Sequence, residues 1–206
     1  MVKKSELGRI EKTSISELEG KSKKLIEIPL FFYRESLNLT LHEEYDNKIN
    51  QFYDTLSEWI QQLKEKIGNI QKIYVESITE MGEAAIAQLK KLSEKNKRLI
   101  QIIEEFLGSG AQLQKTEDKD LLFEYLEWVK TANSPNALDI TLEYLLQTKK
   151  ERTEFLIKRI EETLFDQEIG LLFITFDLEP IINYPNDIEV IKFRPPMVDD
   201  IIKFLG

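Results

Sequence analysis

Acidic side chains follow several short apolar segments of this 206-residue chain, at the points where strands of a sheet would end. Open parallel sheets bind ligands beyond the carboxyl ends of their strands, so residues at these positions are predicted to gather on one edge. Carboxylates gathered there could hold Mg²⁺, Mn²⁺ or Ca²⁺ through oxygen atoms, or act as an acid/base pair. The groups are Tyr33-Arg34-Glu35, Glu76-Ser77, Thr116-Glu117-Asp118 and Asp177-Leu178-Glu179.

The candidates for a catalytic site are these strand-end carboxylates and an arginine that would orient the substrate, namely Glu35, Glu76, Glu117, Asp118, Asp177 and Arg152. Glu76, Glu117 and Asp118 are the candidate metal ligands, because carboxylates alone can hold Mg²⁺ or Mn²⁺. A second interpretation stays open. In it, Ser77 and Thr116 cap helices, Glu117 and Asp118 interact with a helix dipole, and the other acids are solvated.

Other catalytic motifs are weak or missing. His42, the single histidine, lies among acids near a predicted helix start, where it is either a general base, a metal ligand or an exposed and inert side chain. No Gly-x-Ser-x-Gly elbow supplies a serine nucleophile. Gly108-x-Gly110 ends a helix and lacks a third glycine, and no phosphate-binding Gly-x-x-x-x-Gly-Lys-Ser/Thr loop occurs, so the sequence specifies no nucleotide site.

Basic residues recur on the helix that precedes the most apolar strand, in Lys149-Lys150-Glu151-Arg152 and Lys158-Arg159. They could pair with an acidic pocket or hold an anionic substrate. The alternative is a solvated face in which these residues alternate with Glu154, Glu161 and Glu162.

The elements that must position these side chains alternate between strands and helices. Short apolar runs predict strands, and apolar residues three and four apart predict helices. The predicted strands are 25–33, 70–75, 111–115, 171–176 and 188–193. The predicted helices are 40–67, a helix from Ser77 to Gly108 broken near 94–96, 116–129, 140–165, and a short one after Pro195-Pro196.

Strands separated by helices usually form crossovers in a parallel sheet. We therefore predict an α/β fold of three layers, with a mostly parallel sheet covered by long helices. A single domain at 24–206 follows a charged N-terminal segment at 1–23, and 120–165 is a helical insertion. Pro29 predicts an edge strand, a bulge or a strand end. Thr40, Ser77 with Glu80, and Thr116 are the expected helix caps.

Composition restricts the partners. A net charge of -9 and a pI near 4.9 oppose binding to nucleic acid or anionic membranes, which need a basic surface. The chain has no cysteine, which removes disulfides, thiolate zinc sites and cysteine nucleophiles. No signal peptide or membrane span is apparent, so we expect a cytoplasmic protein. Trp59, Tyr125 and Trp128 have helical spacing and predict core or oligomer contacts.

Two parts of the sequence resemble the TraB/Tiki/ChaN-like superfamily and an allied set of uncharacterised prokaryotic proteins. The first is the helix from Glu151 to Leu164 followed by Gly170-Leu171-Leu172-Phe173-Ile174. The second is the short strand and acidic turn Gly110-Ala111-Gln112-Leu113-Gln114-Lys115-Thr116-Glu117-Asp118, together with Ile73-Tyr74-Val75-Glu76. The resemblance covers about residues 24–194.

The resemblance implies strand ends that bear histidines and glutamates for metal binding and hydrolysis, including a Gly-x-x-His after the late strand. This chain has Thr175-Phe176-Asp177-Leu178 there, and Phe31-Phe32-Tyr33-Arg34 where another histidine would stand. The residues Glu76, Glu117, Asp118 and Arg152 match. The resemblance therefore implies that the fold is kept while the metal chemistry is lost or changed.

Two functional hypotheses follow. The first is a non-catalytic binding or scaffold protein on a degenerate hydrolase-like fold, without a cofactor, which acts through its long helices on a protein partner or as a homodimer. The alternative is a hydrolase that depends on Mg²⁺ or Mn²⁺ and uses the strand-end carboxylates.

Overall fold

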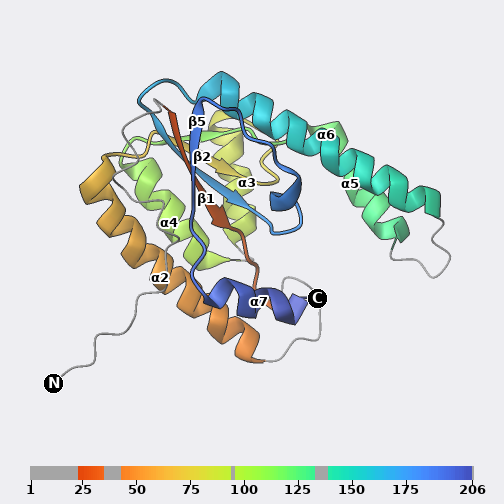
Figure 1. The fold of residues 1–206 in the computed structure, drawn as a ribbon, viewed down its shortest axis with the longest axis horizontal. Helices are drawn as coiled ribbons and strands as arrows, with labels where there is room; N and C mark the ends of the chain where they lie inside the picture. The colour runs from red at the N-terminus through yellow and green to blue at the C-terminus, as the bar shows by residue number, and fades with distance from the viewer. Residues whose placement is uncertain (1–22, 35–42, 94–95, 133–138, 206) are drawn as a thin grey trace.

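The computed structural model describes residues 23–34, 43–93, 96–132 and 139–205. Its elements follow the predicted alternation of strands and helices (Figure 1). In chain order they are β1 (Lys23–Pro29), α2 (Glu43–Ile67), β2 (Lys72–Val75), α3 (Gly82–Ser93), α4 (Lys97–Gly108), β3 (Gln112–Gln114), α5 (Lys119–Ala132), α6 (Asp139–Thr163), β4 (Ile169–Ile174), the short 3-10 helix η2 (Glu179–Ile181), β5 (Ile188–Lys192) and α7 (Met197–Leu205). Glu35, Thr40, His42 and the segment 1–22 lie outside the described residues.

The strands form one five-stranded sheet in the order β3-β2-β4-β1-β5, and every pair in it is parallel. This confirms the predicted α/β fold with a parallel sheet. The most apolar strand, β4, takes the central place and is buried along its whole length, as a strand covered on both faces requires. Pro29 ends β1, which lies inside the sheet between β4 and β5.

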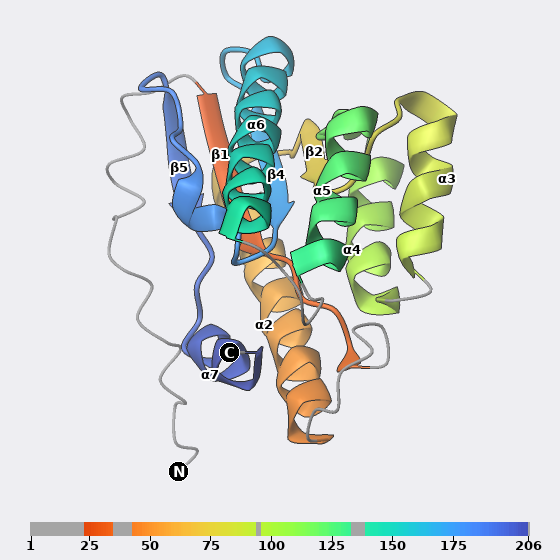
Figure 2. The same cartoon turned by 90° about the vertical axis from the view of Figure 1, so that its right-hand side faces the viewer.

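Helices cover both faces of the sheet and make three layers. Side chains of α2, α3, α4 and α7 pack on one face, against alternate residues such as Ile26 and Leu171. The other face packs against the second half of α6, through Leu156 and Ile160. Figure 2 shows α6 in front of β1 and β4, with α5 beside it. Gly170 lies where β4 meets that face, and a side chain there would come within 3.0 Å of Leu25 and Tyr74.

Two of the expected helix caps are wrong. Ser77 has a φ of 74° and lies in a turn, and α3 begins only at Gly82. Between them, the Thr79 and Glu80 amides donate hydrogen bonds to the Gln88 side chain. Asp118 caps α5, because its Oδ1 accepts from the Asp120 and Leu121 amides. Gln88, from within α3, and Asp118, from the turn before α5, thus supply the acceptors in place of the expected caps.

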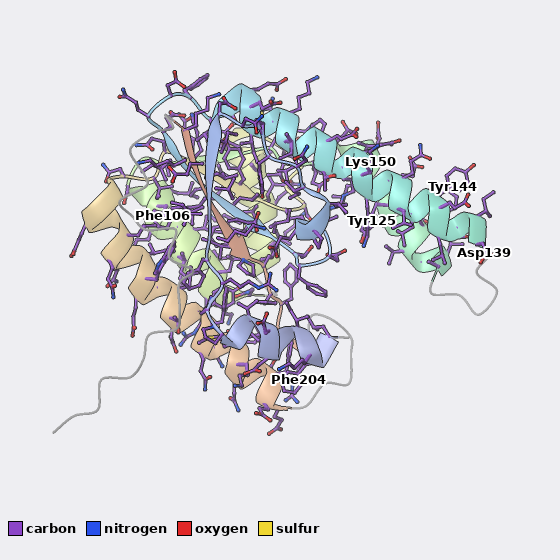
Figure 3. All side chains as sticks on the ribbon, viewed as in Figure 1. Phe106, Tyr125, Asp139, Tyr144, Lys150 and Phe204 are labelled. Carbon is purple, nitrogen blue, oxygen red and sulfur yellow. The ribbon has the colours of Figure 1, made fainter. Side chains whose placement is uncertain are left out.

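Helices α5 and α6 lie side by side as a hairpin in the region predicted as a helical insertion. The hairpin projects beyond the carboxyl ends of the strands (Figure 1), and Asp139 and Tyr144 lie near its far end while Tyr125 lies closer to the sheet (Figure 3). None of the helices within the described ranges has the length and apolar composition that a bilayer-crossing segment needs.

Candidate functional site

A buried arginine joins two strand-end carboxylates. Arg152 on α6 is 2 % exposed, and its Nε and Nη2 donate to the two oxygens of Glu117, at 3.1 and 2.5 Å. The same Nη2 donates to Glu76 Oε1 at 3.2 Å. Glu76 follows β2 and Glu117 follows β3, which are neighbours in the sheet. Bidentate pairing of this kind fixes the guanidinium in one orientation.

Asp177, after β4, extends the cluster through a shared hydroxyl group. Thr175 Oγ1 lies 2.7 Å from Glu76 Oε2 and 2.5 Å from Asp177 Oδ1. Asp177 Oδ2 also pairs with Lys149 Nζ at 3.0 Å and accepts from the Tyr125 hydroxyl at 3.4 Å. Because a hydroxyl has one proton, Thr175 can donate to only one of the two carboxyl groups at a time.

Backbone hydrogen bonds fix the position of Glu117, and residue spacing on α6 fixes those of Lys149 and Arg152. The Thr116 hydroxyl donates to the Val75 carbonyl at 2.6 Å, and the Thr116 and Glu117 amides donate to the Ile78 carbonyl. The end of β3 is thus held against the turn after β2. On α6, Lys149 and Arg152 are three residues apart, so they share the helix face that looks onto the strand ends.

Burial and charge act in opposite directions on these acids. Burial raises the pKa of Glu117 above its ordinary value, and the hydrogen bond from Arg152 offsets only part of that rise. Burial also works to raise the pKa of Asp177, but hydrogen bonds from Thr175 and Lys149 outweigh it and leave the pKa lowered. Burial and the neighbouring Asp177 raise the pKa of Tyr125 to about 12. Tyr125 also lies under the Arg152 guanidinium, with Cζ 4.2 Å from the ring centroid.

The donor set determines what the cluster can bind. Both carboxylate oxygens of Glu76, Glu117 and Asp177 already accept from Arg152, Thr175, Lys149 or Tyr125. In the described part of the chain, no group of three or more His, Cys, Asp or Glu side chains is arranged to hold a metal ion. A divalent ion would have to displace Arg152 or Lys149. Among the described residues, buried Arg152 Nη1 has no hydrogen-bond partner.

The structure thus brings together Glu76, Glu117, Arg152 and Asp177 of the predicted site residues. Asp118 is separate from them because it caps α5. Of the basic helix residues, Lys149 and Arg152 meet the acids, whereas Lys150 and Lys158 line a surface groove. Sequence reasoning missed Thr175 and predicted core or oligomer contacts for Tyr125. The position of Thr175 directly after the central strand was a usable signal.

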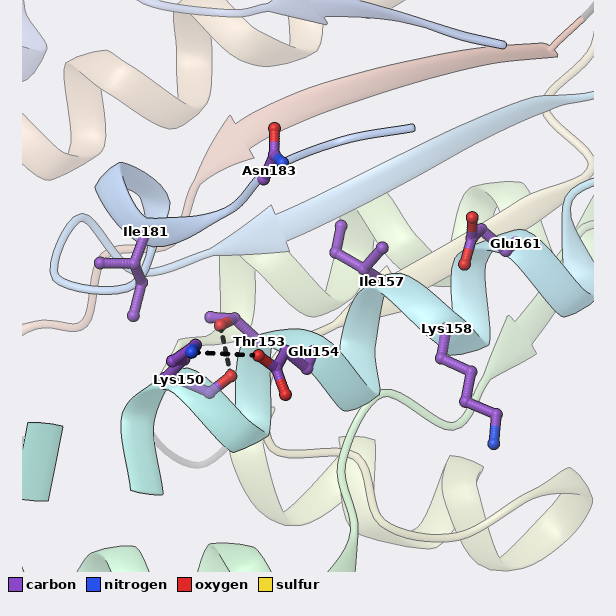
Figure 4. A pocket seen from close by; sticks show the side chains of 8 residues that line it. All are labelled: Lys150, Thr153, Glu154, Ile157, Lys158, Glu161, Ile181 and Asn183. Atoms are coloured by element: carbon purple, nitrogen blue, oxygen red, sulfur yellow. Dashed lines mark hydrogen bonds and ion pairs between the residues drawn. The ribbon is translucent and has the colours of Figure 1, made fainter. Parts of the chain in front are cut away.

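Two pockets lie near the cluster of Arg152, Glu76, Glu117 and Asp177. A cavity of about 230 Å³ is lined by Phe31 and Phe32 after β1, by Thr175 and Asp177 after β4, and by Leu205. The two strands are neighbours whose connections leave toward opposite faces of the sheet, the point where ligands of such sheets bind. A groove of about 370 Å³ lies between α6 and the η2 loop (Figure 4). Lysines and glutamates alternate along the α6 side of this groove.

A second buried acid lies within the sheet itself. Glu27 on β1 is 3 % exposed; it accepts from the Tyr184 hydroxyl and pairs with Lys192 at 2.9 Å. Burial raises the pKa of Glu27, and these two hydrogen bonds oppose the rise. Lys192 also pairs with Glu179. These contacts fasten β5 and the η2 loop to β1, so the acidic residue within an apolar run has a structural role.

The lowered pKa of Asp177 predicts a contribution to acid stability. A carboxyl group whose pKa is lower in the folded than in the unfolded state stabilises the fold above its unfolded pKa of about 3.9. That contribution is lost as the pH falls through the lower, folded pKa. We therefore expect the melting temperature to fall less between pH 7 and pH 3 in Asp177→Asn than in the wild type, as measured by circular dichroism.

The matched control for this measurement is Asp199→Asn. Asp199 pairs with Arg194 on the surface at 3.2 Å, where solvent screens the interaction. This variant should follow the wild-type pH profile. Identical acid profiles for Asp177→Asn and the wild type would contradict the stabilising role of the Thr175 and Lys149 contacts.

Comparison of the chain with models of known protein families, with curated proteins and with solved structures found no match.

Proposed function

We propose that this chain is a non-catalytic binding or scaffold protein that contacts its partner through the α5–α6 hairpin. The strand-end cluster supports the non-catalytic part of the proposal. Arg152 and Lys149 hold the carboxylates that would have to serve as metal ligands or bases, and Glu117 and Arg152 are almost fully buried. In this proposal, the cluster anchors the base of the hairpin to the sheet.

An apolar stripe on the hairpin carries the proposal. Leu142 and Leu146 are 49 % and 66 % exposed, and they lie four residues apart on one face of α6. The same face continues through Lys149, which reaches Asp177, to Leu156 and Ile160, which pack on the sheet. One side of α6 is thus covered by the sheet in its second half and uncovered in its first half.

Helix α5 contributes to the same stripe. Trp128 and Tyr144 stack across the hairpin with ring centroids 4.9 Å apart and mark one of its flanks. A residue two positions along a helix is rotated by about 200° around the helix axis. Leu126 is two positions from Trp128, and Leu142 and Leu146 are each two positions from Tyr144. All three leucines therefore lie on the flank of the hairpin opposite the stacked rings. We call Leu126, Leu142 and Leu146 the hairpin stripe. Apolar patches of this kind, exposed on a protein surface, mark sites of protein association.

Site-specific photo-crosslinking in the cells that make the protein tests this proposal. A benzoylphenylalanine side chain at Leu142 should give crosslinked products, because the stripe would lie against the partner. Ile140 is the matched control, since it is 53 % exposed and lies two residues away, on the opposite side of α6. The same probe at Ile140 should give few products. Equal yields from the two positions, or none from either, would refute the proposal.

The alternative function is a Mg²⁺- or Mn²⁺-dependent hydrolase related to the TraB/Tiki/ChaN-like superfamily. The gathering of Glu76, Glu117 and Asp177 at the carboxyl edge of the sheet favours it. Because Arg152 and Lys149 occupy those oxygens, we expect 1 mM MnCl₂ or MgCl₂ to leave the melting temperature unchanged, whereas an ion that binds only the folded state raises it. A rise that disappears in Glu76→Gln would favour the hydrolase and count against a non-catalytic protein.

A further inference from the structure

We propose that the cavity at the ends of β1 and β4 binds a small organic cation that carries a trimethylammonium group. The inference goes beyond the proposed function and does not depend on the hairpin stripe. The cavity has a volume of about 230 Å³, which is enough for several water molecules. It can therefore hold a compact head group of that size.

Aromatic residues make up half of the cavity lining, namely Phe31, Phe32, Tyr45 and Phe176. Phe31 and Tyr45 are almost fully buried, and the Tyr45 hydroxyl donates to the Phe32 carbonyl at 2.9 Å, so this part of the wall is fixed. Phe32 and Phe176 are half-buried and keep part of their surface accessible. Aromatic rings attract cations, and rings around a quaternary ammonium ion are a recurrent use of this attraction.

The cavity also has a charge that selects a cation. Asp177 is the one charged side chain among the described residues that line it, and this side chain is 34 % exposed. Burial works to raise the pKa of Asp177, but hydrogen bonds from Thr175 and Lys149 leave the pKa lowered, so the carboxylate is ionised at neutral pH. One carboxylate in an otherwise uncharged wall favours a cation over a neutral or anionic ligand.

The surrounding cluster leaves this negative charge partly unbalanced. Its three carboxylates meet only two cations, Arg152 and Lys149. When all five groups are ionised, one negative charge remains in excess. A bound monovalent cation would balance it, and charges attract each other more strongly in a partly buried site than in water.

The existing contacts of Asp177 favour a methylated ammonium ion. Oδ1 lies against the Thr175 hydroxyl, and Oδ2 accepts from Lys149 and Tyr125. A metal ion or a primary ammonium ion uses carboxylate oxygens as ligands or acceptors, so it would have to displace these donors. A trimethylammonium group has no N–H. It can lie beside the carboxylate and the aromatic rings without breaking those hydrogen bonds.

Titration of the full chain with choline chloride, followed by NMR chemical shifts, tests the proposal. Choline should bind with a dissociation constant on the order of millimolar, as expected for so small a ligand. The alcohol with a tert-butyl group in place of the trimethylammonium group has the same shape without the charge, and it should bind at least tenfold more weakly. The amides of Phe32 and Phe176 should shift most. No saturable shift up to about 50 mM choline, or equal affinity for the alcohol, would overturn the proposal.

Two pairs of variants locate the site. Asp177→Asn removes the charge and should weaken choline binding at least tenfold, whereas Asp199→Asn, which changes a surface pair with Arg194, should bind like the wild type. Phe176→Leu removes a ring from the cavity wall and should weaken binding severalfold. Phe165→Leu changes an exposed ring that does not line the cavity and should have no effect. Unchanged affinity in both Asp177→Asn and Phe176→Leu, with folding checked by circular dichroism, would overturn the assignment of the cavity.

Two further ligands identify the kind of cation. Ethanolamine has N–H donors in place of the methyl groups and should bind severalfold more weakly than choline; equal affinity would overturn the preference for a methylated head group. Acetylated trimethyllysine amide presents the same head group as a protein side chain does, and it should bind no more tightly than choline. A complex at least tenfold tighter would assign the cavity to a methylated lysine of a protein and overturn the small-molecule ligand.

Discussion

Replacing Arg152 with methionine is expected to lower the free energy of unfolding by about 3–5 kcal/mol, the range for breaking a buried ion pair by removing one partner. Arg152 supplies every side-chain donor that Glu117 receives and one of those that Glu76 receives. Methionine has a similar length but no donor. The variant therefore leaves two buried carboxylates without their cation, and urea denaturation measures the loss.

Lys150→Met is the control on the same helix. Lys150 pairs with Glu154 one turn away, with the two side chains 73 % and 64 % exposed, and exposed pairs of this kind contribute at most about 1 kcal/mol. A second variant identifies the cause of the effect. If the unpaired charge is responsible, Glu117→Gln added to Arg152→Met should recover part of the lost stability. A loss below about 1 kcal/mol in Arg152→Met itself would contradict the buried cluster.

Replacing Asn96 with alanine should cost about 2–4 kcal/mol, because the side chain satisfies several buried groups at once. Asn96 is 1 % exposed. Its Oδ1 accepts from the Leu99 amide and caps α4, while its Nδ2 donates to the Phe31 carbonyl and the Tyr53 hydroxyl, both at 2.7 Å. Alanine would remove the cap and leave these partners short of hydrogen bonds in the core.

Urea denaturation of Asn50→Ala provides the comparison. Asn50 makes a single side-chain contact of this kind, with the Tyr33 hydroxyl at 2.8 Å, and its loss should cost about 1 kcal/mol or less. Asn96→Asp separates the two roles of Asn96, since aspartate keeps the cap acceptor but not the amide donors. If Asn96→Ala and Asn50→Ala cost the same, Asn96 does not join α4 to the strand end as described.

The two halves of α6 differ in what covers them. The first half of the helix is free of the sheet and exposes Leu142 and Leu146, while the second half is fixed by Leu156, Ile160 and the Arg152 cluster. A helix needs an apolar contact for most of its stability in a protein. A bound partner would supply that contact to the first half of α6, and the buried cluster keeps the uncovered half at a constant angle to the sheet.

The sequence alone determined the order of strands and helices, because the apolar periodicity of each segment is local. It predicted the central position of β4 from an unbroken apolar run, and the break between α3 and α4 near Asn96. It also predicted that Glu76, Glu117 and Asp177 would share one edge, since all parallel strands end on the same side. Residue spacing suffices for each of these inferences.

Only the tertiary structure decided which of the basic residues on α6 meet those acids. Lys149, Lys150, Arg152, Lys158 and Arg159 look alike in the sequence, and their partners depend on the rotation and position of α6 over the strand ends. The ion pair between Arg152 and Glu76 joins residues 76 positions apart, a separation that no local pattern encodes. The same placement of α6 buries half of its apolar face and leaves Leu142 and Leu146 uncovered beyond the edge of the sheet.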